Sequence, residues 1–178
     1  KIANVRPTDL DLIICTSSSP EYIFPATACL IQDQLGATKA GAFDLLAACS
    51  GFIYALNMGA QAIRSGSIKN ALIIGSETLS RFVNWKDRNT CILFGDAAGV
   101  VLLEPSEDES YGLIDHRHYT DGAGGEFLYM KGGGSLNPPT HETVEQKMHY
   151  LYQDGKSVFK VAVIGMADVS AEIMKRNN

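Results

Sequence analysis

Three apolar runs constrain the fold of this 178-residue chain more than any other feature of its sequence. Residues 10–15 are LDLIIC, residues 70–77 are NALIIGSE and residues 98–104 are AGVVLLE. Strands covered by helices on both faces are apolar throughout rather than alternating, so each run predicts a buried strand. A further extended segment, AGAFDLL at 40–46, and two helical patterns lie between the first two runs. This alternation of strands and helices predicts a layered α/β sheet.

The two helical patterns have recognisable ends and different polarity. The first begins at Pro25 and ends at Gly36, since glycine is favoured just after a helix. The second covers residues 50–63, where Asn57 and Gln61 are the strongly polar side chains. We therefore expect the second helix to be buried on almost every side.

The second part of the chain changes character. The segment PSEDES at 105–110 is a charged break and the candidate boundary between two subdomains. Residues 111–120 alternate like an exposed strand, and residues 121–140 are a glycine-rich stretch that we expect to be a long loop. An amphipathic helix is expected from Lys156 onward.

Composition and charge exclude several classes of function. The formal net charge is -5 and Lys and Arg form no runs, so nucleic acid is not an expected partner. Apolar runs fall short of the roughly 20 residues that cross a bilayer, so no membrane association is expected and the protein is predicted to be soluble and cytoplasmic. The chain lacks an initiator Met and stops within a helical pattern, so we expect it to be a piece of a longer protein.

The chain contains four cysteines and four histidines, which are potential metal ligands. Cys15, Cys29, Cys49 and Cys91 form no CxxC pair, so neither a zinc site nor a redox motif is expected and all four should be reduced. His116 and His118 are two residues apart on the expected strand at 111–120, which would place them on one face, but no third ligand is evident. No metal site is expected.

Cys49 differs from the other cysteines in its position. The segment AGAFDLL runs directly into the helix at 50–63, which places Cys49 in the turn at the helix N-terminus. Unpaired N–H groups and the helix dipole favour a thiolate there. The neighbours of Cys49 are small, and a backbone N–H of the turn could polarise a thioester or ester carbonyl. The local sequence predicts an acyl-accepting cysteine, with a buried structural thiol as the alternative.

The string DLLAACSGF also carries a family resemblance. Together with TSSSPEYIFPATACLIQDQLG before it and ALIIGSETLSR, DRNTCILFGDAAGVVLLE and DGKSVFKVAV after it, this string resembles β-ketoacyl-acyl carrier protein synthase III, a thiolase-fold condensing enzyme. The form ACSGF, rather than ACSSS, resembles the initiating class. The resemblance implies a layered α-β-α-β-α fold of two duplicated halves. Residues 1–104 would then be the remainder of the N-terminal half, which carries the nucleophile, and residues 105–178 the start of an incomplete C-terminal half.

The resemblance further implies an activity. Cys49 would attack acyl-CoA, with acetyl-CoA as the expected primer, and hold the acyl group while malonyl-acyl carrier protein decarboxylates and condenses with it. The product would be a 3-oxoacyl-carrier protein of type II fatty acid synthesis. Acyl-CoA is then a substrate, no cofactor is bound permanently, and the enzyme is a homodimer.

The resemblance also implies roles for individual residues. Phe24 would reach across the dimer into the partner's acyl pocket. For Phe24, and for the apolar residues named next, ordinary core packing is the alternative role. Leu79, Phe94 and Phe159 would contact the acyl substrate. Arg88 and Trp85 would contact the nucleotide of CoA. Lys160 would contact the acidic carrier protein. Solvated surface charge is the alternative for Arg88 and Lys160.

One departure from the family limits what the chain does alone. The family's His and Asn, in HQAN-like and NxSxAS-like strings, stabilise the enolate formed on decarboxylation, and neither string occurs here. We expect both residues to lie outside this chain. Two alternatives stay open: a thiolase-fold acyltransferase of secondary metabolism, which would use another acceptor, and a non-catalytic subunit that resembles condensing enzymes.

Overall fold

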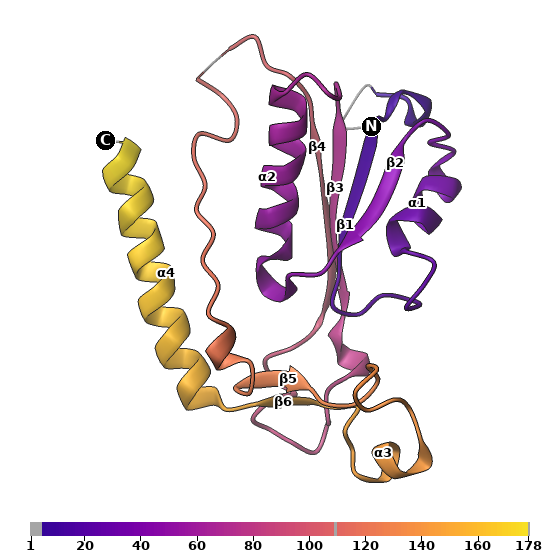
Figure 1. Cartoon of the computed structure of the whole chain (residues 1–178), viewed down its shortest axis with the longest axis vertical. Helices are drawn as coiled ribbons and strands as arrows, with labels where there is room; N and C mark the ends of the chain where they lie inside the picture. The colour runs from indigo at the N-terminus through magenta and orange to yellow at the C-terminus, as the bar shows by residue number, and fades with distance from the viewer. Residues whose placement is uncertain (1–4, 109, 178) are drawn as a thin grey trace. The chain divides into compact units, whose positions relative to one another are not determined.

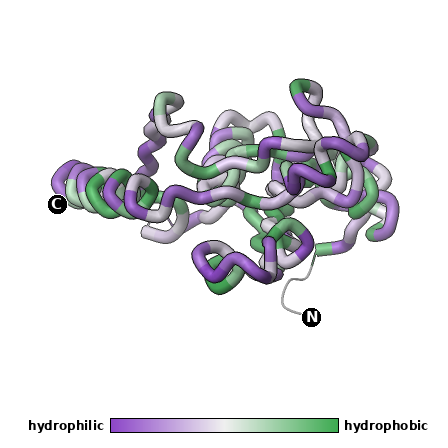
Figure 2. The backbone as a smooth tube through the Cα atoms, turned by 90° about the horizontal axis from the view of Figure 1, so that it is seen from below, coloured by the Kyte–Doolittle hydropathy of each residue, from purple (hydrophilic) through white to green (hydrophobic). Residues whose placement is uncertain are grey.

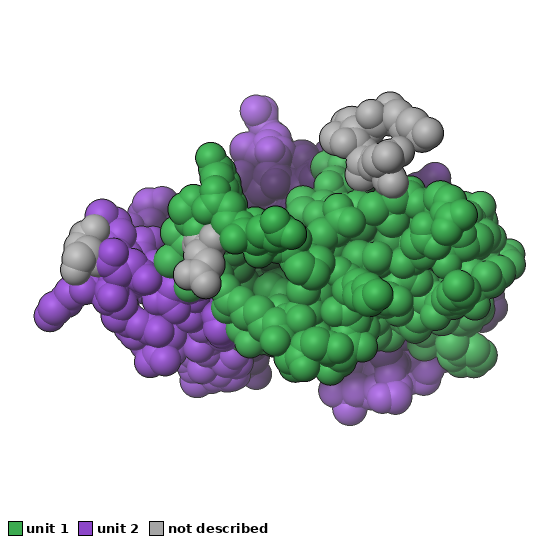
Figure 3. Space-filling model, turned by 90° about the horizontal axis from the view of Figure 1, so that it is seen from above, with its two compact units in different colours: residues 1–77, 96–114 green, residues 78–95, 115–178 purple. Residues whose placement is uncertain are grey.

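The computed structural model describes residues 5–108 and 110–177, and its contacts divide the chain into two compact units. Unit 1 consists of residues 1–77 and 96–114, and unit 2 of residues 78–95 and 115–178, which Figure 3 shows in different colours. These units describe local packing. The predicted division at 104/105 concerns two halves of a duplicated fold and stays a prediction.

Unit 1 contains a four-stranded sheet in the order β2-β1-β3-β4. Its strands are β1 (Leu12–Thr16), β2 (Gly41–Leu45), β3 (Ala71–Thr78) and β4 (Asp96–Leu103). Strand β1 pairs in parallel with β2 on one side and with β3 on the other. The strands predicted from the apolar runs and from AGAFDLL are therefore confirmed.

Two helices cover opposite faces of this sheet (Figure 1). Helix α1 (Thr27–Leu35) ends at Gly36, whose φ of 67° is the left-handed conformation that glycine adopts without strain. Helix α2 is Gly51–Arg64. Alternation along β1 directs Ile13 and Cys15 into the cluster that contains Ala28 of α1, and Ile14 into the cluster that contains Ala55 of α2. The expected layering of helix, sheet and helix is confirmed.

Burial differs from the expectation at two elements of unit 1. Helix α2 is buried only along the strip Gly51, Ala55 and Gly59, and Ile53 on its other side is 51% exposed. Strand β4 is exposed over Asp96–Val101, although its apolar run predicted cover on both faces. Both expectations are wrong because an apolar run shows that a segment can be buried, whereas burial also needs an element to pack on each face.

Unit 2 is built from short strands and one long helix. Strands β5 (Leu128–Met130) and β6 (Leu151–Gln153) pair antiparallel, and the helices are α3 (His141–Glu145) and α4 (Gly155–Asn177). The expected helix from Lys156 is confirmed. The expectation that residues 121–140 form only a long loop is wrong, because this stretch contains strand β5. The remaining elements are the single turns η1 (Pro7–Asp9), η2 (Ala48–Ser50), η3 (Leu79–Arg81) and η4 (Gly122–Gly124).

Residues 111–120 are not a strand, so that prediction is wrong. In place of a partner strand, side chains of this segment bind α4. Asp115 accepts hydrogen bonds from Arg176 at 3.1 Å and from Asn177 at 2.8 Å, and Tyr119 donates to Glu172 at 2.6 Å. Polar alternation in a sequence does not distinguish strand pairing from such side-chain contacts.

Helix α4 carries hydrophobic and hydrophilic residues in alternation along its length, as Figure 2 shows near the C-terminus. Val158, Ala162, Val169 and Ile173 of α4 are half-buried, whereas Gly165 is exposed. No helix among residues 5–108 and 110–177 combines the length and the apolar character needed to cross a bilayer.

Candidate functional site

Cys49 lies where the sequence places it, on the turn between a strand and a helix. Strand β2 ends at Leu45, the single turn η2 spans Ala48–Ser50, and α2 begins at Gly51. The side chain of Cys49 is exposed. Because β1, β2 and β3 are parallel, the turn lies at the carboxyl edge of the sheet, where α/β proteins bind ligands.

The residue before Cys49 has an unusual backbone. Ala48 has φ of 45°, in the left-handed region that non-glycine residues adopt at a cost of roughly 1–2 kcal/mol. Ser50 N–H donates to the Ala47 carbonyl at 3.1 Å and closes the turn. The chain thus reverses sharply at Ala48 and presents the next side chain, Cys49, to solvent.

Small residues behind Cys49 allow the turn to pack closely on the sheet. A Cβ on Gly51 would lie 3.0 Å from the Thr16 Cβ and 3.3 Å from its Oγ1. A Cβ on Gly75 would lie 3.3 Å from the ring of Phe52. The ends of β1 and β3 therefore support the first turn of α2 directly.

The segment that follows β1, residues 17–26, is held at both ends by carboxylates. Glu77 of β3 accepts from the Ser18 N–H at 2.8 Å and from the Ser19 hydroxyl at 2.7 Å. Asp44 of β2 accepts from the N–H groups of Thr27 and Ala28, both at 2.7 Å. These are charge-assisted bonds, and Asp44 occupies the N-terminus of α1, which its own N-cap residue does not cap with a side chain.

Between its two fixed ends this segment exposes three consecutive large apolar side chains. Tyr22 is 59% exposed, Ile23 86% and Phe24 81%. Phe24, which lies in unit 1, was predicted to reach across the dimer into the partner's acyl pocket, and this role stays a prediction.

The other cysteines show how different the environment of Cys49 is. Cys15 is fully buried in β1, and burial, followed by the negative charges of Asp44 and Glu77, raises the pKa of its thiol to about 11. Cys29 is exposed on α1 and Cys91 is half-buried. All four cysteines are free in the structure.

Six predicted site residues lie in unit 2, whereas Cys49 lies in unit 1. Leu79 and Phe94 are half-buried, Trp85 is 67% exposed, and Arg88 is exposed. Phe159, which is 69% exposed, and Lys160, also exposed, lie on α4. Their roles stay predictions.

The loop that carries Arg88 has a defined conformation. Asp87 accepts from the Asn89 N–H at 3.0 Å and from the Thr90 hydroxyl at 3.2 Å, and Thr90 is almost fully buried. Arg88 is therefore presented to solvent from a fixed turn, as a residue that binds an anionic ligand would be.

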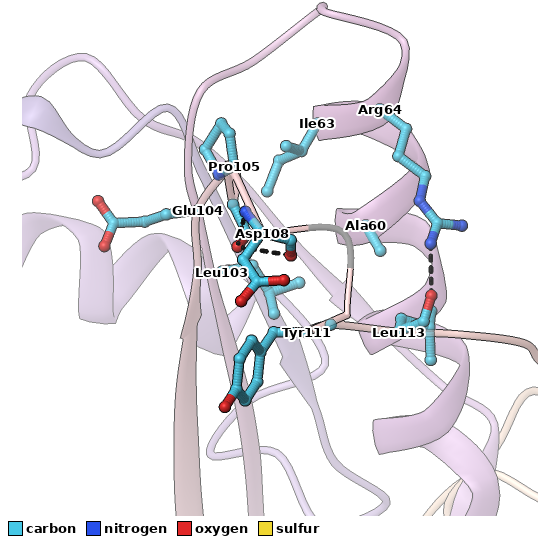
Figure 4. Close-up of a pocket in the computed structure, with 11 residues that line it drawn as sticks. Ala60, Ile63, Arg64, Leu103, Glu104, Pro105, Asp108, Tyr111 and Leu113 are labelled. Atoms are coloured by element: carbon cyan, nitrogen blue, oxygen red, sulfur yellow. Dashed lines mark hydrogen bonds between the residues drawn. The ribbon is translucent and has the colours of Figure 1, made fainter.

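Two hollows are lined by residues other than Cys49. One, of about 400 Å³, is formed by the C-terminal end of α2 and the segment after β4 (Figure 4), where Arg64 donates to the Leu113 carbonyl. Helix α2 rises by about 1.5 Å per residue, so Arg64 lies roughly 20 Å from the turn that carries Cys49. The other hollow, of about 510 Å³, is an open groove along α4 that includes Lys160.

The histidine pair does not form a metal-binding cluster. The rings of His116 and His118 are 5.3 Å apart, and burial, then the neighbouring His116, lowers the pKa of His118. Over the described parts of the chain, no three His, Cys, Asp or Glu side chains converge in a way that could hold an ion.

Sequence reasoning missed three residues at the carboxyl edge of the sheet: Thr16, which lies against Gly51, and Asp44 and Glu77, which fix the segment after β1. Each contacts another part of the chain, and Glu77 follows its partners Ser18 and Ser19 by 59 and 58 positions in the sequence. Their local signal is weak, since each is simply a polar residue near the end of an apolar strand.

A sheet in which β1, β2 and β3 run parallel, helices on both of its faces and a solvent-exposed cysteine on a strand-to-helix turn are features of a thiolase-like α/β fold. Known proteins show which family this chain resembles. Residues 43–122 match the family model of 3-oxoacyl-[acyl-carrier-protein] synthase III. The β-ketoacyl-[acyl-carrier-protein] synthase III of Chlorobium luteolum is 55% identical over 170 residues, which are 95% of this chain and 52% of the relative.

Solved structures agree with these sequence matches. The 3-oxoacyl-[acyl-carrier-protein] synthase III of Aquifex aeolicus superimposes with a TM-score of 0.84 at 42% identity, over 97% of this chain and 51% of that protein. The priming β-ketosynthase of the R1128 polyketide pathway gives a TM-score of 0.78 at 31% identity, over 94% of this chain and 49% of the other. The resemblance to β-ketoacyl-acyl carrier protein synthase III is therefore confirmed over nearly the whole chain, which spans about half the length of these relatives.

Proposed function

We propose that the protein containing this chain is the initiating condensing enzyme of type II fatty acid synthesis, a soluble cytoplasmic homodimer. The observation that supports this most directly is Cys49, exposed on a strained turn at the carboxyl edge of the sheet, in a chain 55% identical to a β-ketoacyl-acyl carrier protein synthase III. In this proposal residues 1–104 and 105–178 belong to the two halves of the duplicated fold.

In the first step the Cys49 sulfur, as thiolate, attacks the thioester carbonyl of acyl-CoA. The new C–S bond forms at Cys49, the bond to the CoA sulfur breaks, and CoA leaves with the proton that Cys49 lost. The N–H groups of Ser50 and Gly51 donate within the turn, to Ala47 and Ala48. We therefore assign the N–H of Cys49 itself as a donor to the oxyanion.

In the second step malonyl-acyl carrier protein loses carbon dioxide, and the resulting carbanion attacks the acyl carbon. A C–C bond forms, the bond to Cys49 breaks, and the product is a 3-oxoacyl-acyl carrier protein. The enolate needs electrostatic stabilisation that Cys49 does not provide, and we propose that the His and Asn that supply it lie outside this chain.

The substrate contacts follow from the family resemblance. We propose Phe24, Leu79, Phe94 and Phe159 for the acyl group, Arg88 and Trp85 for the nucleotide of acyl-CoA, and Lys160 for the acyl carrier protein. The fixed turn around Asp87 supports the assignment of Arg88, because a preorganised cation binds a phosphate at a lower entropic cost. Acyl-CoA acts as a substrate, and no permanently bound cofactor is proposed.

Mass spectrometry of the intact, complete protein after incubation with acetyl-CoA tests this function. We expect an acetyl group on the peptide that contains Cys49 and its removal when malonyl-acyl carrier protein is added. Cys49→Ser should reduce the adduct by at least about 1000-fold, and Cys29→Ser, which removes another exposed thiol, should leave it unchanged. An unmodified protein after incubation with every short acyl-CoA would instead favour a non-catalytic subunit.

A second candidate is a priming ketosynthase of polyketide synthesis, favoured by the likeness to the R1128 enzyme at a TM-score of 0.78. It predicts the same acyl-Cys49 adduct. The two candidates differ in the second step, because a polyketide enzyme would prefer the carrier protein of its own pathway. Rates of adduct removal by malonyl-loaded carrier proteins of both kinds would distinguish them.

A further inference from the structure

Glu77, like Thr16 and Asp44, has no role implied by the family resemblance. Along β3, Ile73 packs in the cluster with Ala55 of α2, and Gly75 faces Phe52 of α2. Alternation places Glu77 on the same face, which is the face that carries the turn with Cys49. Its half-buried carboxylate accepts from Ser18 and Ser19.

Asp44 lies on the opposite face, where it binds the first two N–H groups of α1. Residues 17–26 therefore cross the carboxyl edge of the sheet from the α2 face to the α1 face, with each end fixed by a carboxylate from a strand next to β1. Two bonds of 2.7–2.8 Å at each end give this segment one conformation instead of several.

The side chains that segment 17–26 exposes between its fixed ends are large and apolar. Tyr22, Ile23 and Phe24 are 59%, 86% and 81% exposed, and such a run of large apolar side chains indicates a binding surface. Phe24 of this run is the residue that the proposed function assigns to the acyl pocket of the partner subunit, which would hold an apolar acyl chain. If this segment forms one wall of an acyl pocket, a fixed position of the wall limits the size of the acyl group, whereas a mobile wall adapts to several sizes.

We infer that Glu77 is a positioning residue that determines acyl-chain selectivity: its bonds to Ser18 and Ser19 hold the apolar segment 17–26 in the conformation in which Phe24 limits the acyl pocket of the partner subunit. This inference depends on the proposed function, since it needs Cys49 to accept an acyl group. It adds a residue that acts through the 17–26 segment and touches neither the acyl group nor Cys49.

The ratio of kcat/KM for acetyl-CoA to that for hexanoyl-CoA, measured with the complete protein, tests the inference. We expect Glu77→Ala to change this ratio by about tenfold, the size of discrimination that a pocket wall provides. Glu77→Gln should stay within about twofold of wild type, because its carboxamide accepts from the Ser18 N–H and donates to the Ser19 hydroxyl. Glu107→Ala, which removes an exposed carboxylate after β4, is the control and should leave the ratio unchanged.

Ser19→Ala keeps the test decisive if Glu77→Ala does not fold. It removes the hydroxyl bond and leaves the bond from the Ser18 backbone, so the ratio should shift in the same direction by a smaller factor. A Glu77→Ala or Ser19→Ala protein that is equally slow on both substrates would overturn the inference and leave Glu77 a structural role. Wild-type protein that takes an acyl group from neither substrate would overturn the proposed function as well, so the two failures are distinguishable.

Discussion

Cys15 and Cys49 are the same chemical group in two contrasting regions of unit 1. Cys15 lies in the middle strand β1, fully buried, with a pKa raised to about 11 by burial and by Asp44 and Glu77. Cys49 lies just after the neighbouring strand, exposed on a turn at the start of α2. Cys15 contributes apolar volume to the core, and Cys49 is available to react. The difference shows that placement, and not residue type, makes a thiol usable.

Alkylation by iodoacetamide at pH 8 gives the largest effect expected from this comparison. Cys49 should react at least about 100-fold faster than Cys15, because Cys15 is both inaccessible and almost entirely protonated at that pH. Quantitative peptide mapping against time measures both rates. Equal rates at the two cysteines would break the comparison.

Cys29 is the matched control for that experiment, since it is exposed on α1 and donates a weak hydrogen bond to the Ala42 carbonyl. A Cys49 rate several-fold above that of Cys29 would show that the turn activates the thiol. Equal rates for Cys49 and Cys29 would show that exposure alone accounts for the reactivity, which is the expectation for a non-catalytic subunit.

The pH dependence of the free energy of unfolding tests the buried thiol, Cys15. Below pH 9.0, the ordinary pKa of the thiol, Cys15 is protonated in both the folded and unfolded states and adds no pH dependence. Between pH 9.0 and about 11 the unfolded state alone ionises, so the free energy of unfolding should fall by up to about 3 kcal/mol.

Urea unfolding of wild type and Cys15→Ala across this pH range measures that fall. Tyr and Lys side chains also titrate there, so the difference in slope between the two proteins is the relevant quantity. Cys15→Ala should be less stable at neutral pH yet lose less stability as the pH rises. Parallel curves would show that Cys15 ionises as easily in the folded state as in the unfolded one.

Gly51→Ala should have a smaller effect on the difference between the two cysteines. It changes the packing of the turn that carries Cys49 and leaves the core cluster around Cys15 intact. The added Cβ would lie 3.0 Å from the Thr16 Cβ, so the turn must shift, at a cost of about 1–3 kcal/mol in unfolding free energy. Alkylation of Cys49 should change rate while Cys15 stays unreactive. Gly99→Ala is the control, since nothing lies within 4 Å of the Cβ it would add.

The sequence predicts the sheet of unit 1 and the turn of Cys49 well because both depend on local pattern. The runs at 10–15 and 70–77 become β1 and β3, and the passage from AGAFDLL into a helix places Cys49. Predictions that depend on what packs against a segment are less accurate. The stretch 111–120 alternates in polarity yet has no partner strand, and β4 is apolar yet exposed.

The supporting contacts of the site are the hardest to predict from sequence. Nothing near Glu77 in the sequence indicates that its carboxylate binds Ser18 and Ser19, because parallel pairing of β1 with β3 brings these residues together. Asp44 likewise caps a helix that precedes it in the chain. Such bonds join elements whose relative position is itself a result of folding, so local patterns do not encode them.

The φ of 45° at Ala48 has a consequence for which amino acids this position tolerates. Glycine, asparagine and aspartate enter the left-handed region readily, whereas valine, isoleucine and threonine are strongly disfavoured there because their branched Cβ crowds the backbone. Alanine is the smallest residue that still has a Cβ. A saturation library at this single codon, sorted for folded protein, should therefore retain small or amide side chains and lose the branched ones, whatever their hydrophobicity.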